Sequence, residues 1–222
     1  MRVETFKKCV YIILFLLIAL FFTKDIDFFG SKFYENVKEI ENPEDLTVLV
    51  NKNYKLMSNY IPPDLELISI QYATDDKYMR KEAKEAFERL SEDARQMGYQ
   101  IIATSTYRSY EYQEKLYDYY VKTKGQEYAD LCSARPGHSE HQTGLSVDVM
   151  GSNQDYDLFV EAIEFDWMKK NAHKYGFILR YPEGKEKVTG FKYEPWHYRY
   201  VGKEVATIIY ENNWTLEEYK RS

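Results

Sequence analysis

The sequence predicts an α+β domain with a mainly antiparallel sheet flanked by helices, preceded by an N-terminal membrane anchor. The apolar patterns of helices and strands mix along the chain without the strict alternation that produces a parallel sheet. With 222 residues, of which 44% are hydrophobic, the chain can bury one sizeable core and carry an appendage. Its net charge of -6 includes no basic run beyond short pairs, which argues against nucleic acid as a partner.

Residues 1–27 are predicted to form a signal anchor. Arg2, Lys7 and Lys8 precede an unbroken apolar run, which predicts a short transmembrane segment over about residues 9–23. No small-residue cleavage site follows this run, so we expect an uncleaved single-pass anchor in the cell membrane with the domain outside. Secretion after signal cleavage is the alternative. A buried core helix is disfavoured because no polar face interrupts the run.

Residues 28–45 are polar and charged without a clear period, and we expect a stalk between the membrane and a domain over residues 46–222. In that domain, residues 46–50 are a predicted strand. Cys132 has no partner in the exported part of the chain, because the other cysteine, Cys9, lies in the apolar run. No disulfide is therefore predicted.

A strong helix is predicted over residues 78–97. Its apolar residues recur at spacings of four and three, which gives one apolar stripe, and Gly98 is a natural stop. Residues 99–104 have the character of a strand. Ser109 can cap a second helix that runs to about Lys122.

The C-terminal half continues the mixed pattern, and Gly176 is expected to end its long helix. The predicted elements are, in order, a strand over residues 145–150, a helix over 159–175, strands over 177–180 and 196–201, and a helix over 203–211.

The segment from Ser139 to Asp148 carries the first candidate metal ligands. On a strand, Ser146 and Asp148 share one face while the valines beside them enter the core. A carboxylate buried on such a strand is costly unless it is paired or bound to a cation. Gly144 permits a tight backbone turn, which can bring His141 over the face that carries Asp148. An imidazole and a carboxylate then lie within reach of one ion.

A second imidazole and a second carboxylate come from Glu194-Pro-Trp-His197. Pro195 argues against a helix interior, so we expect a turn into a strand, with Glu194 at the bend. Two imidazoles and one carboxylate leave a fourth position open, which a catalytic zinc needs for the water that becomes the nucleophile. Glu194 would stand one water away, suited to general base and then general acid duty. The sequence therefore predicts a zinc hydrolase.

Each of these residues alone is weak evidence. A single histidine is more often a core or surface residue than a ligand, and we interpret His138 and His173 in that way. Asp148 alone could be an ion-pair partner. Cys132 is interpreted as a small, apolar-tolerant residue near a turn rather than a nucleophile. The combination of residue types and spacing is what indicates a metal centre.

The motifs resemble those of a known family. The pattern S-x-H-x-x-G-x-x-x-D over residues 139–148, with E-x-x-H over residues 194–197, is similar to that of the VanY-type D-alanyl-D-alanine carboxypeptidases. These belong to the lysostaphin/D-Ala-D-Ala-peptidase/hedgehog zinc superfamily. The resemblance extends from about Leu46 to the C-terminus and includes T-Y-R-S at 106–109, N-A-H-K-Y-G-F at 171–177 and Y-E-P-W-H-Y at 193–198.

The resemblance implies a role for each site residue. Arg108 matches the family's arginine near the scissile bond, where a cation stabilises the oxyanion. Ser146 departs from the alanine that the family often carries, a small change that should leave the ligands in place. The implied zinc ligands are His141, Asp148 and His197, the implied catalytic base is Glu194, and the implied substrate-binding residues are Ser139, Gln113, Tyr107 and Trp196.

The implied activity is removal of the terminal D-Ala from peptidoglycan stem peptides that end in D-Ala-D-Ala, with Zn²⁺ as the cofactor. The implied fold is of the hedgehog/D-Ala-D-Ala-peptidase type. Three alternatives remain open. The first is an L,D-carboxypeptidase or a peptidoglycan endopeptidase on the same scaffold. The second is a non-catalytic zinc-binding cell-wall module, and the third is a membrane-tethered structural protein without metal.

Overall fold

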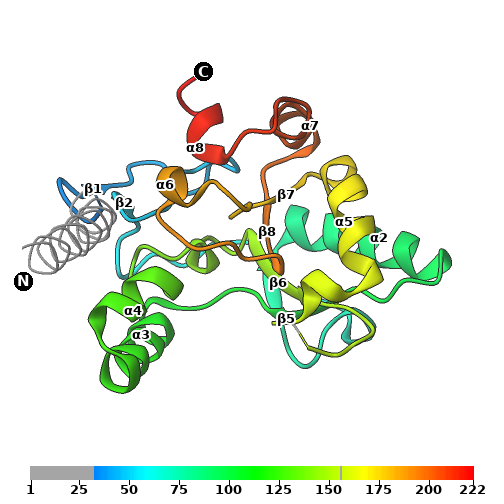
Figure 1. Ribbon diagram of the computed structural model, residues 1–222, viewed down its shortest axis with the longest axis horizontal. Helices are drawn as coiled ribbons and strands as arrows, with labels where there is room; N and C mark the ends of the chain where they lie inside the picture. The colour runs from blue at the N-terminus through cyan, green and yellow to red at the C-terminus, as the bar shows by residue number, and fades with distance from the viewer. Residues whose placement is uncertain (1–32, 156) are drawn as a thin grey trace, which may run out of the picture. The chain divides into compact units, whose positions relative to one another are not determined.

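The computed structural model describes residues 33–155 and 157–222, and residues 37–222 form one compact unit (Figure 1). The predicted anchor over residues 1–27 lies outside the described residues, as does the first part of the predicted stalk. Within the described ranges, no helix has both the length and the apolar character needed to cross a membrane.

The centre of this unit is a four-stranded antiparallel sheet, the largest sheet among the described residues. Its order is β5 (Ile102–Ser105), β6 (Ser146–Met150), β8 (His197–Tyr200) and β7 (Phe177–Leu179). The prediction of an α+β domain with a mainly antiparallel sheet is confirmed. In the register of β6 and β8, Asp148 lies opposite His197, so strand alternation places both side chains on one face.

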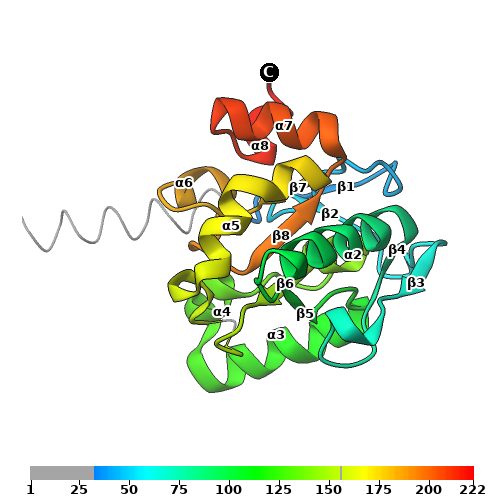
Figure 2. The ribbon, with the colours of Figure 1, turned by 90° about the vertical axis from the view of Figure 1, so that its right-hand side faces the viewer.

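The opposite face of the sheet is packed by helices. Val147 and Val149 of β6 and Tyr198 of β8 are fully buried in the main core. The helices α2 (Lys81–Gln96) and α5 (Ile163–Asn171) supply apolar residues to the same core. In Figure 2, α2 lies in front of the sheet. One face is therefore apolar and covered, and the face with Asp148 and His197 is left for polar chemistry.

The start of α2 differs from the prediction. Tyr78–Arg80 forms strand β4, which pairs antiparallel with β3 (Leu65–Leu67), and the helix begins only at Lys81. Met79 lies on this strand and is fully buried. In the sequence it continues the apolar stripe of the helix, although it is not a helical residue.

Two other helices agree with the prediction in part. Ser109 caps α3 (Tyr110–Lys124), because its hydroxyl accepts a hydrogen bond from the Tyr112 N–H. The helix predicted over residues 159–175 is divided, because Ala162 is extended at φ -76° and ψ 144°. Gly176 ends it as predicted, in the left-handed region at φ 91°. The remaining elements are β1 (Lys38–Glu39), β2 (Tyr54–Lys55), α4 (Gln126–Cys132), α6 (Glu186–Thr189), α7 (Lys203–Asn212), α8 (Leu216–Tyr219), and the 3₁₀ helices η1 (Ile70–Tyr72), η2 (Glu140–Thr143), η3 (Phe159–Glu161) and η4 (Ala172–Tyr175).

The predicted strand over residues 46–50 is wrong. The carbonyls of Leu46 and Val48 accept hydrogen bonds from the Arg199 guanidinium at 2.9 Å, rather than from a neighbouring strand. The compact unit also begins earlier than the predicted boundary at residue 46, because β1 pairs with β2 in parallel. Residues 37–45 therefore lie in this unit rather than in a separate stalk.

Gly144, just before β6, offers a test of the local backbone. It adopts φ +67°, and an added Cβ would lie 2.9 Å from Leu65 Cδ2 and 3.1 Å from Arg80 Cγ. We expect Gly144→Ala to lower the free energy of unfolding by about 1–3 kcal/mol, measured by denaturant titration of the metal-free protein. Gly184→Ala is the matched control, because Gly184 has φ +78° but no neighbouring atom within 4 Å of the added Cβ. An equal loss in both variants would rule out the crowding at Gly144.

Candidate active site

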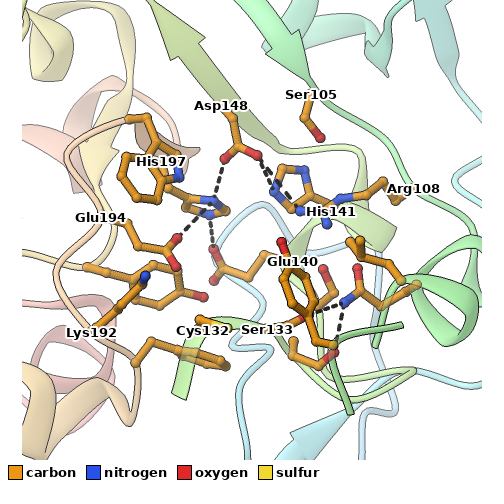
Figure 3. A pocket seen from close by; sticks show the side chains of 18 of the residues that line it. Ser105, Arg108, Cys132, Ser133, Glu140, His141, Asp148, Lys192, Glu194 and His197 are labelled. Carbon is orange, nitrogen blue, oxygen red and sulfur yellow. Dashed lines mark hydrogen bonds and ion pairs between the residues drawn. The ribbon is translucent and has the colours of Figure 1, made fainter. Parts of the chain in front are cut away.

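Three side chains from two segments that are distant in sequence meet on the polar face of the sheet (Figure 3). His141 lies on η2, which ends at the left-handed Gly144, and the chain then enters β6 with Asp148. His197 is the first residue of the neighbouring strand β8. The predicted meeting of His141, Asp148 and His197 is observed: their ligand atoms all lie within 4.8 Å of one another.

The carboxylate of Asp148 lies between the two imidazoles. Its Oδ2 is 3.3 Å from His141 Nε2, and its Oδ1 is 2.9 Å from His197 Nδ1. The two rings are close to perpendicular, at 80°, with centroids 4.9 Å apart. Burial alone would raise the pKa of Asp148, but the two histidines hold it well below its usual range.

The tautomer of His141 suits a metal ligand. Its Nδ1 is 2.6 Å from the carbonyl of Thr106, which can only accept, so Nδ1 carries the hydrogen and Nε2 keeps its lone pair. Nε2 is buried and has no hydrogen-bond partner among the described residues. Burial, together with the Arg108 charge, lowers the pKa of His141 to about 4, so the ring is neutral at neutral pH. A neutral imidazole with an unused buried nitrogen fits a metal ion.

His197 differs from His141 because its ring faces carboxylates on both sides. Burial alone would lower its pKa, but the contacts with Asp148 and Glu140 raise the pKa to about 9 in the metal-free protein. Two imidazoles and one carboxylate are nitrogen and oxygen donors of the kind that zinc accepts, with a fourth position left over.

Glu194 lies in the turn before β8, as predicted. Its backbone N–H donates to the Tyr181 carbonyl, and its Oε2 is 3.9 Å from His197 Nδ1. Burial raises the pKa of its carboxyl to about 7, and the nearby Asp148 charge adds to this rise. A carboxyl that titrates near neutral pH can take a proton and return it.

Arg108 reaches the same centre from the loop between β5 and α3. Its backbone N–H donates to the His141 carbonyl at 3.2 Å, and its Nη2 is 3.8 Å from Asp148 Oδ2. Its Nε is buried without a hydrogen-bond partner among the described residues. The guanidinium therefore keeps donors for a ligand.

These residues line a cavity of about 400 Å³. Of the predicted substrate-binding residues, Ser139, Gln113 and Trp196 line it as well. Tyr107 is not among the lining residues, and its backbone N–H donates to the Tyr78 carbonyl. The floor of the cavity is η2, β6 and β8, and one wall comes from α3 and α4 through Tyr112, Leu116, Tyr120 and Tyr128.

Gln113 presents an acceptor to this cavity. Its Nε2 is 2.7 Å from the Ala134 carbonyl, and this contact fixes the amide orientation because a carbonyl cannot donate. The same Nε2 also lies 3.2 Å from the Ser133 hydroxyl. Oε1 is buried with no hydrogen-bond partner among the described residues. Gln113 therefore suits an N–H group of a ligand rather than a carboxylate.

The residues that we interpreted as structural stay outside the metal cluster. His138 Nδ1 lies 2.8 Å from the Asn51 carbonyl, and His173 stacks on Tyr210 with ring centroids 3.7 Å apart. Cys132 lines the cavity, but burial raises the pKa of its thiol, which disfavours the nucleophilic thiolate.

Sequence reasoning missed two residues that contact His197. The Tyr181 ring is tilted by 35° to the His197 ring, with centroids 4.9 Å apart. Glu140 is buried, and its Oε2 lies 3.6 Å from His197 Nε2. The sequence contained a signal for Glu140. This residue lies between Ser139 and His141 of the motif, where a solvent-exposed glutamate would be unexpected.

A model of the VanY family, described as D-alanyl-D-alanine carboxypeptidase, matches residues 76–203. The chain belongs to the VanY family. The predicted family is therefore confirmed, and with it the prediction of a zinc metallopeptidase.

Relatives in and around the VanY family include two solved structures with a similar fold. The bifunctional D-Ala-D-Ala dipeptidase and carboxypeptidase VanXYC of Enterococcus gallinarum is 40% identical, over 77% of this chain and 91% of that protein. The solved LdcB LD-carboxypeptidase is 42% identical with a TM-score of 0.79, over 84% of this chain and 91% of that one. A vancomycin-resistance D,D-pentapeptidase VanY variant in complex with Zn(II) is 33% identical with a TM-score of 0.68, over 78% and 98% of the two chains.

Proposed function

We propose that this chain is a zinc-dependent D,D-carboxypeptidase that removes the terminal D-Ala from peptidoglycan stem peptides ending in D-Ala-D-Ala. The observation that carries the proposal is the meeting of His141, Asp148 and His197 in one cavity with Glu194. Membership of the VanY family supports the peptide-bond chemistry, and one solved VanY enzyme is a Zn(II) complex.

The residues divide the reaction among them. Zinc held by His141, Asp148 and His197 would act as a Lewis acid and lower the pKa of a water molecule to about 7. Glu194 takes the proton of the attacking water and returns it to the nitrogen of the leaving D-alanine. Arg108 supplies positive charge for the oxygen on which negative charge develops.

The remaining polar groups of the cavity orient the peptide. Ser139 is buried and lines the cavity, so its hydroxyl is suited to donate to the terminal carboxylate. Gln113 Oε1 accepts from a peptide N–H, because its own Nε2 is used by Ala134 and Ser133. Together they select for a free C-terminal peptide end.

A second candidate is an L,D-carboxypeptidase, which releases D-Ala from a tetrapeptide stem instead. The likeness to LdcB favours it, because both the identity of 42% and the TM-score of 0.79 exceed those of the VanY complex. A non-catalytic module is disfavoured, because Glu194 and Arg108 line the same cavity as the metal-ligand set.

We also propose that residues 1–27 anchor the enzyme in the cell membrane with the domain outside. The support is the basic end and the apolar run of this segment. Stem peptides of the wall lie on that side, so an external domain would meet its substrate. Protease treatment of intact cells tests this, and a domain that is protected from external protease would contradict it.

The purified full chain, incubated with defined pentapeptide, tetrapeptide and cross-linked stem peptides, separates the candidates. We expect D-Ala release to be fastest from the pentapeptide. Faster release from the tetrapeptide would establish the L,D activity, and cleavage of the cross-link alone would establish an endopeptidase. No hydrolysis by a zinc-loaded protein would leave only the binding module.

Metal removal is expected to abolish this activity. Dialysis against a chelator should lower the rate by more than about 10²-fold, because the ion supplies several kcal/mol of transition-state stabilisation. Added Zn²⁺ should restore the rate in the wild-type chain but not in His141→Ala, which lacks one ligand. Full activity of a protein shown by elemental analysis to be metal-free would overturn the proposal.

A further inference from the structure

Glu140 carries a negative charge directly below the metal-ligand set without being part of it. Resting on the proposed function, we propose that Glu140 is a positioning residue: its carboxylate accepts the Nε2–H of His197 and so leaves Nδ1 as the nitrogen that binds zinc. The carboxylate would select the tautomer of the ligand rather than touch the substrate.

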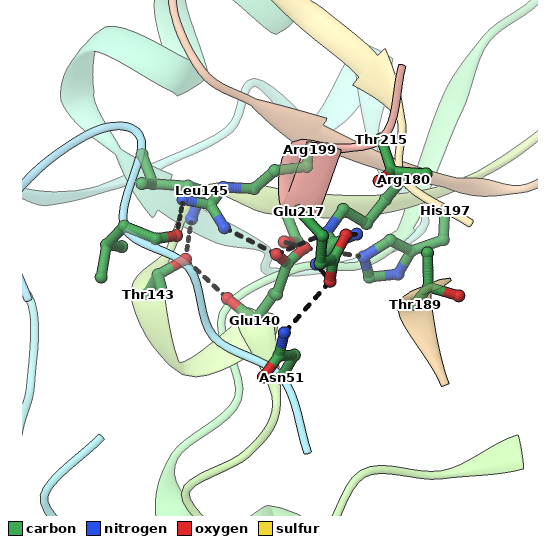
Figure 4. Close-up of polar contacts among 12 residues, drawn as sticks. Asn51, Glu140, Thr143, Leu145, Arg180, Thr189, His197, Arg199, Thr215 and Glu217 are labelled. Carbon is green, nitrogen blue, oxygen red and sulfur yellow. Dashed lines mark hydrogen bonds and ion pairs between the residues drawn. The ribbon is translucent and has the colours of Figure 1, made fainter. Parts of the chain in front are cut away.

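The two oxygens of Glu140 have different partners (Figure 4). Oε1 accepts from Arg180 Nε at 2.7 Å and from Arg199 Nη1 at 2.8 Å. Oε2 faces His197 Nε2 at 3.6 Å, and the Ser146 hydroxyl lies 3.5 Å from it. Two guanidinium groups hold Oε1, which leaves Oε2 directed at His197.

The two nitrogens of His197 also have different surroundings. Nδ1 faces Asp148 Oδ1 at 2.9 Å and Glu194 Oε2 at 3.9 Å, on the side of the catalytic groups. Nε2 is buried, and among the described residues it has no hydrogen bond shorter than the 3.6 Å approach of Glu140 Oε2. In the metal-free protein both nitrogens face a carboxylate, and both carry hydrogen because the pKa of the ring is raised. A zinc ligand gives up one of these hydrogens, and the Glu140 carboxylate beside Nε2 favours keeping the other one there. Carboxylates commonly orient metal-bound histidines in this way.

The charge of Glu140 is balanced inside the protein. Arg180 and Arg199 are 0% exposed, and Glu140 is 1% exposed. Arg180 also binds Glu217 of α8 through two parallel contacts of 2.9 and 2.7 Å. Two guanidinium groups therefore meet two carboxylates, and this buried charge network keeps Glu140 ionised.

Glu217 provides a matched comparison. It is 2% exposed, belongs to the same network and binds the same Arg180, but its side chain contacts Arg180 and Asn51 rather than His197. A purely structural role would make Glu140 and Glu217 equivalent. A positioning role predicts that only Glu140 affects the metal.

The substitution Glu140→Gln keeps the shape of the side chain but replaces the acceptor that faces His197 with a donor. The two guanidinium groups draw the amide oxygen toward them, so the amide NH₂ faces His197 Nε2. Two N–H groups cannot pair, so His197 moves its hydrogen to Nδ1, where it blocks the metal. Zinc affinity should fall even in a folded protein.

We expect Glu140→Gln to weaken zinc binding by about 10- to 100-fold, and Glu217→Gln to change it by less than about 3-fold. Zinc affinity is measured by competition with a chelator in the full chain, and denaturant unfolding of the metal-free variants shows whether their stabilities are comparable. Equal zinc affinities in the two variants would overturn the proposal. The zinc-affinity measurement contains no substrate, so its result does not depend on hydrolysis. A wild-type protein that binds zinc but hydrolyses no stem peptide would contradict the proposed function and would leave the role of Glu140 untouched.

A second measurement needs no variant and so does not depend on folding of Glu140→Gln. Nitrogen-15 NMR of the wild-type chain, loaded with zinc, distinguishes the protonated from the metal-bound ring nitrogen. We expect hydrogen on Nε2 and zinc on Nδ1 of His197. Zinc on Nε2 would show that Glu140 does not set the tautomer.

Discussion

Replacing Glu194 with alanine is expected to lower kcat for D-Ala release by about 10²- to 10⁴-fold, the usual contribution of a positioned general acid and base. The carboxyl is buried beside His197 and lines the cavity of the metal-ligand set, where it can take the water proton and return it to the leaving amine. The rate is measured by detection of free D-alanine under steady-state conditions with saturating substrate.

Two controls accompany this variant. Zinc content should be unchanged, because Glu194 is not one of the three side chains that form the metal cluster. Glu183→Ala, which removes an exposed glutamate from the nearby turn, should leave the rate as it is. A Glu194→Ala protein with wild-type kcat would mean that another group is the base.

The second large effect is expected at Arg180. Arg180→Met leaves Glu140 and Glu217 with less opposite charge in the interior, and breaking one side of a buried ion pair costs about 3–5 kcal/mol of unfolding free energy. The guanidinium makes three contacts of 2.9 Å or less with these two carboxylates. Urea unfolding of the metal-free chain, followed by circular dichroism, measures the loss.

An exposed ion pair serves as the control for Arg180. Lys55 Nζ lies 3.8 Å from Glu39 Oε2, and both side chains are about half exposed. Lys55→Met should cost about 0–1 kcal/mol, because water screens such pairs. If Arg180→Met were no more harmful than Lys55→Met, the buried network would not contribute to stability.

The metal-ligand set could be predicted from the sequence because the alternation of side chains between the two faces of a strand is a local rule. Asp148 shares a face with Ser146 and opposes His197 in the sheet, as expected for residues on two neighbouring antiparallel strands. What the sequence could not show was the pairing itself, since β6 and β8 are separated by the whole segment that contains α5 and β7.

The errors have a common physical cause, which is that tertiary partners override local pattern. Residues 46–50 look like a strand, but their carbonyls bind Arg199, a residue far along the chain. Tyr78–Arg80 continued the stripe of α2, but it pairs with β3 instead. In both places the local apolar pattern is real and the long-range partner decides the backbone.

The short helix α8 was missed although a local signal was present. Thr215 and Glu218 form a capping box, in which the hydroxyl of Thr215 accepts from the Glu218 N–H and the Glu218 carboxylate accepts from the Thr215 N–H. The T-x-x-E spacing is visible in the sequence. It matters here because this helix carries Glu217 into the buried charge network.

The cavity combines two parts of the fold with different tolerance to change. Its floor is continuous with the packed sheet, so a substitution there would disturb the core as well as the metal ligands. Its wall of Tyr112, Leu116, Tyr120 and Tyr128 stands on α3 and α4, outside the main apolar core. Directed evolution could therefore retune the length and stereochemistry of the accepted peptide by exchanging these four side chains, while the hydrolytic apparatus beneath stays untouched.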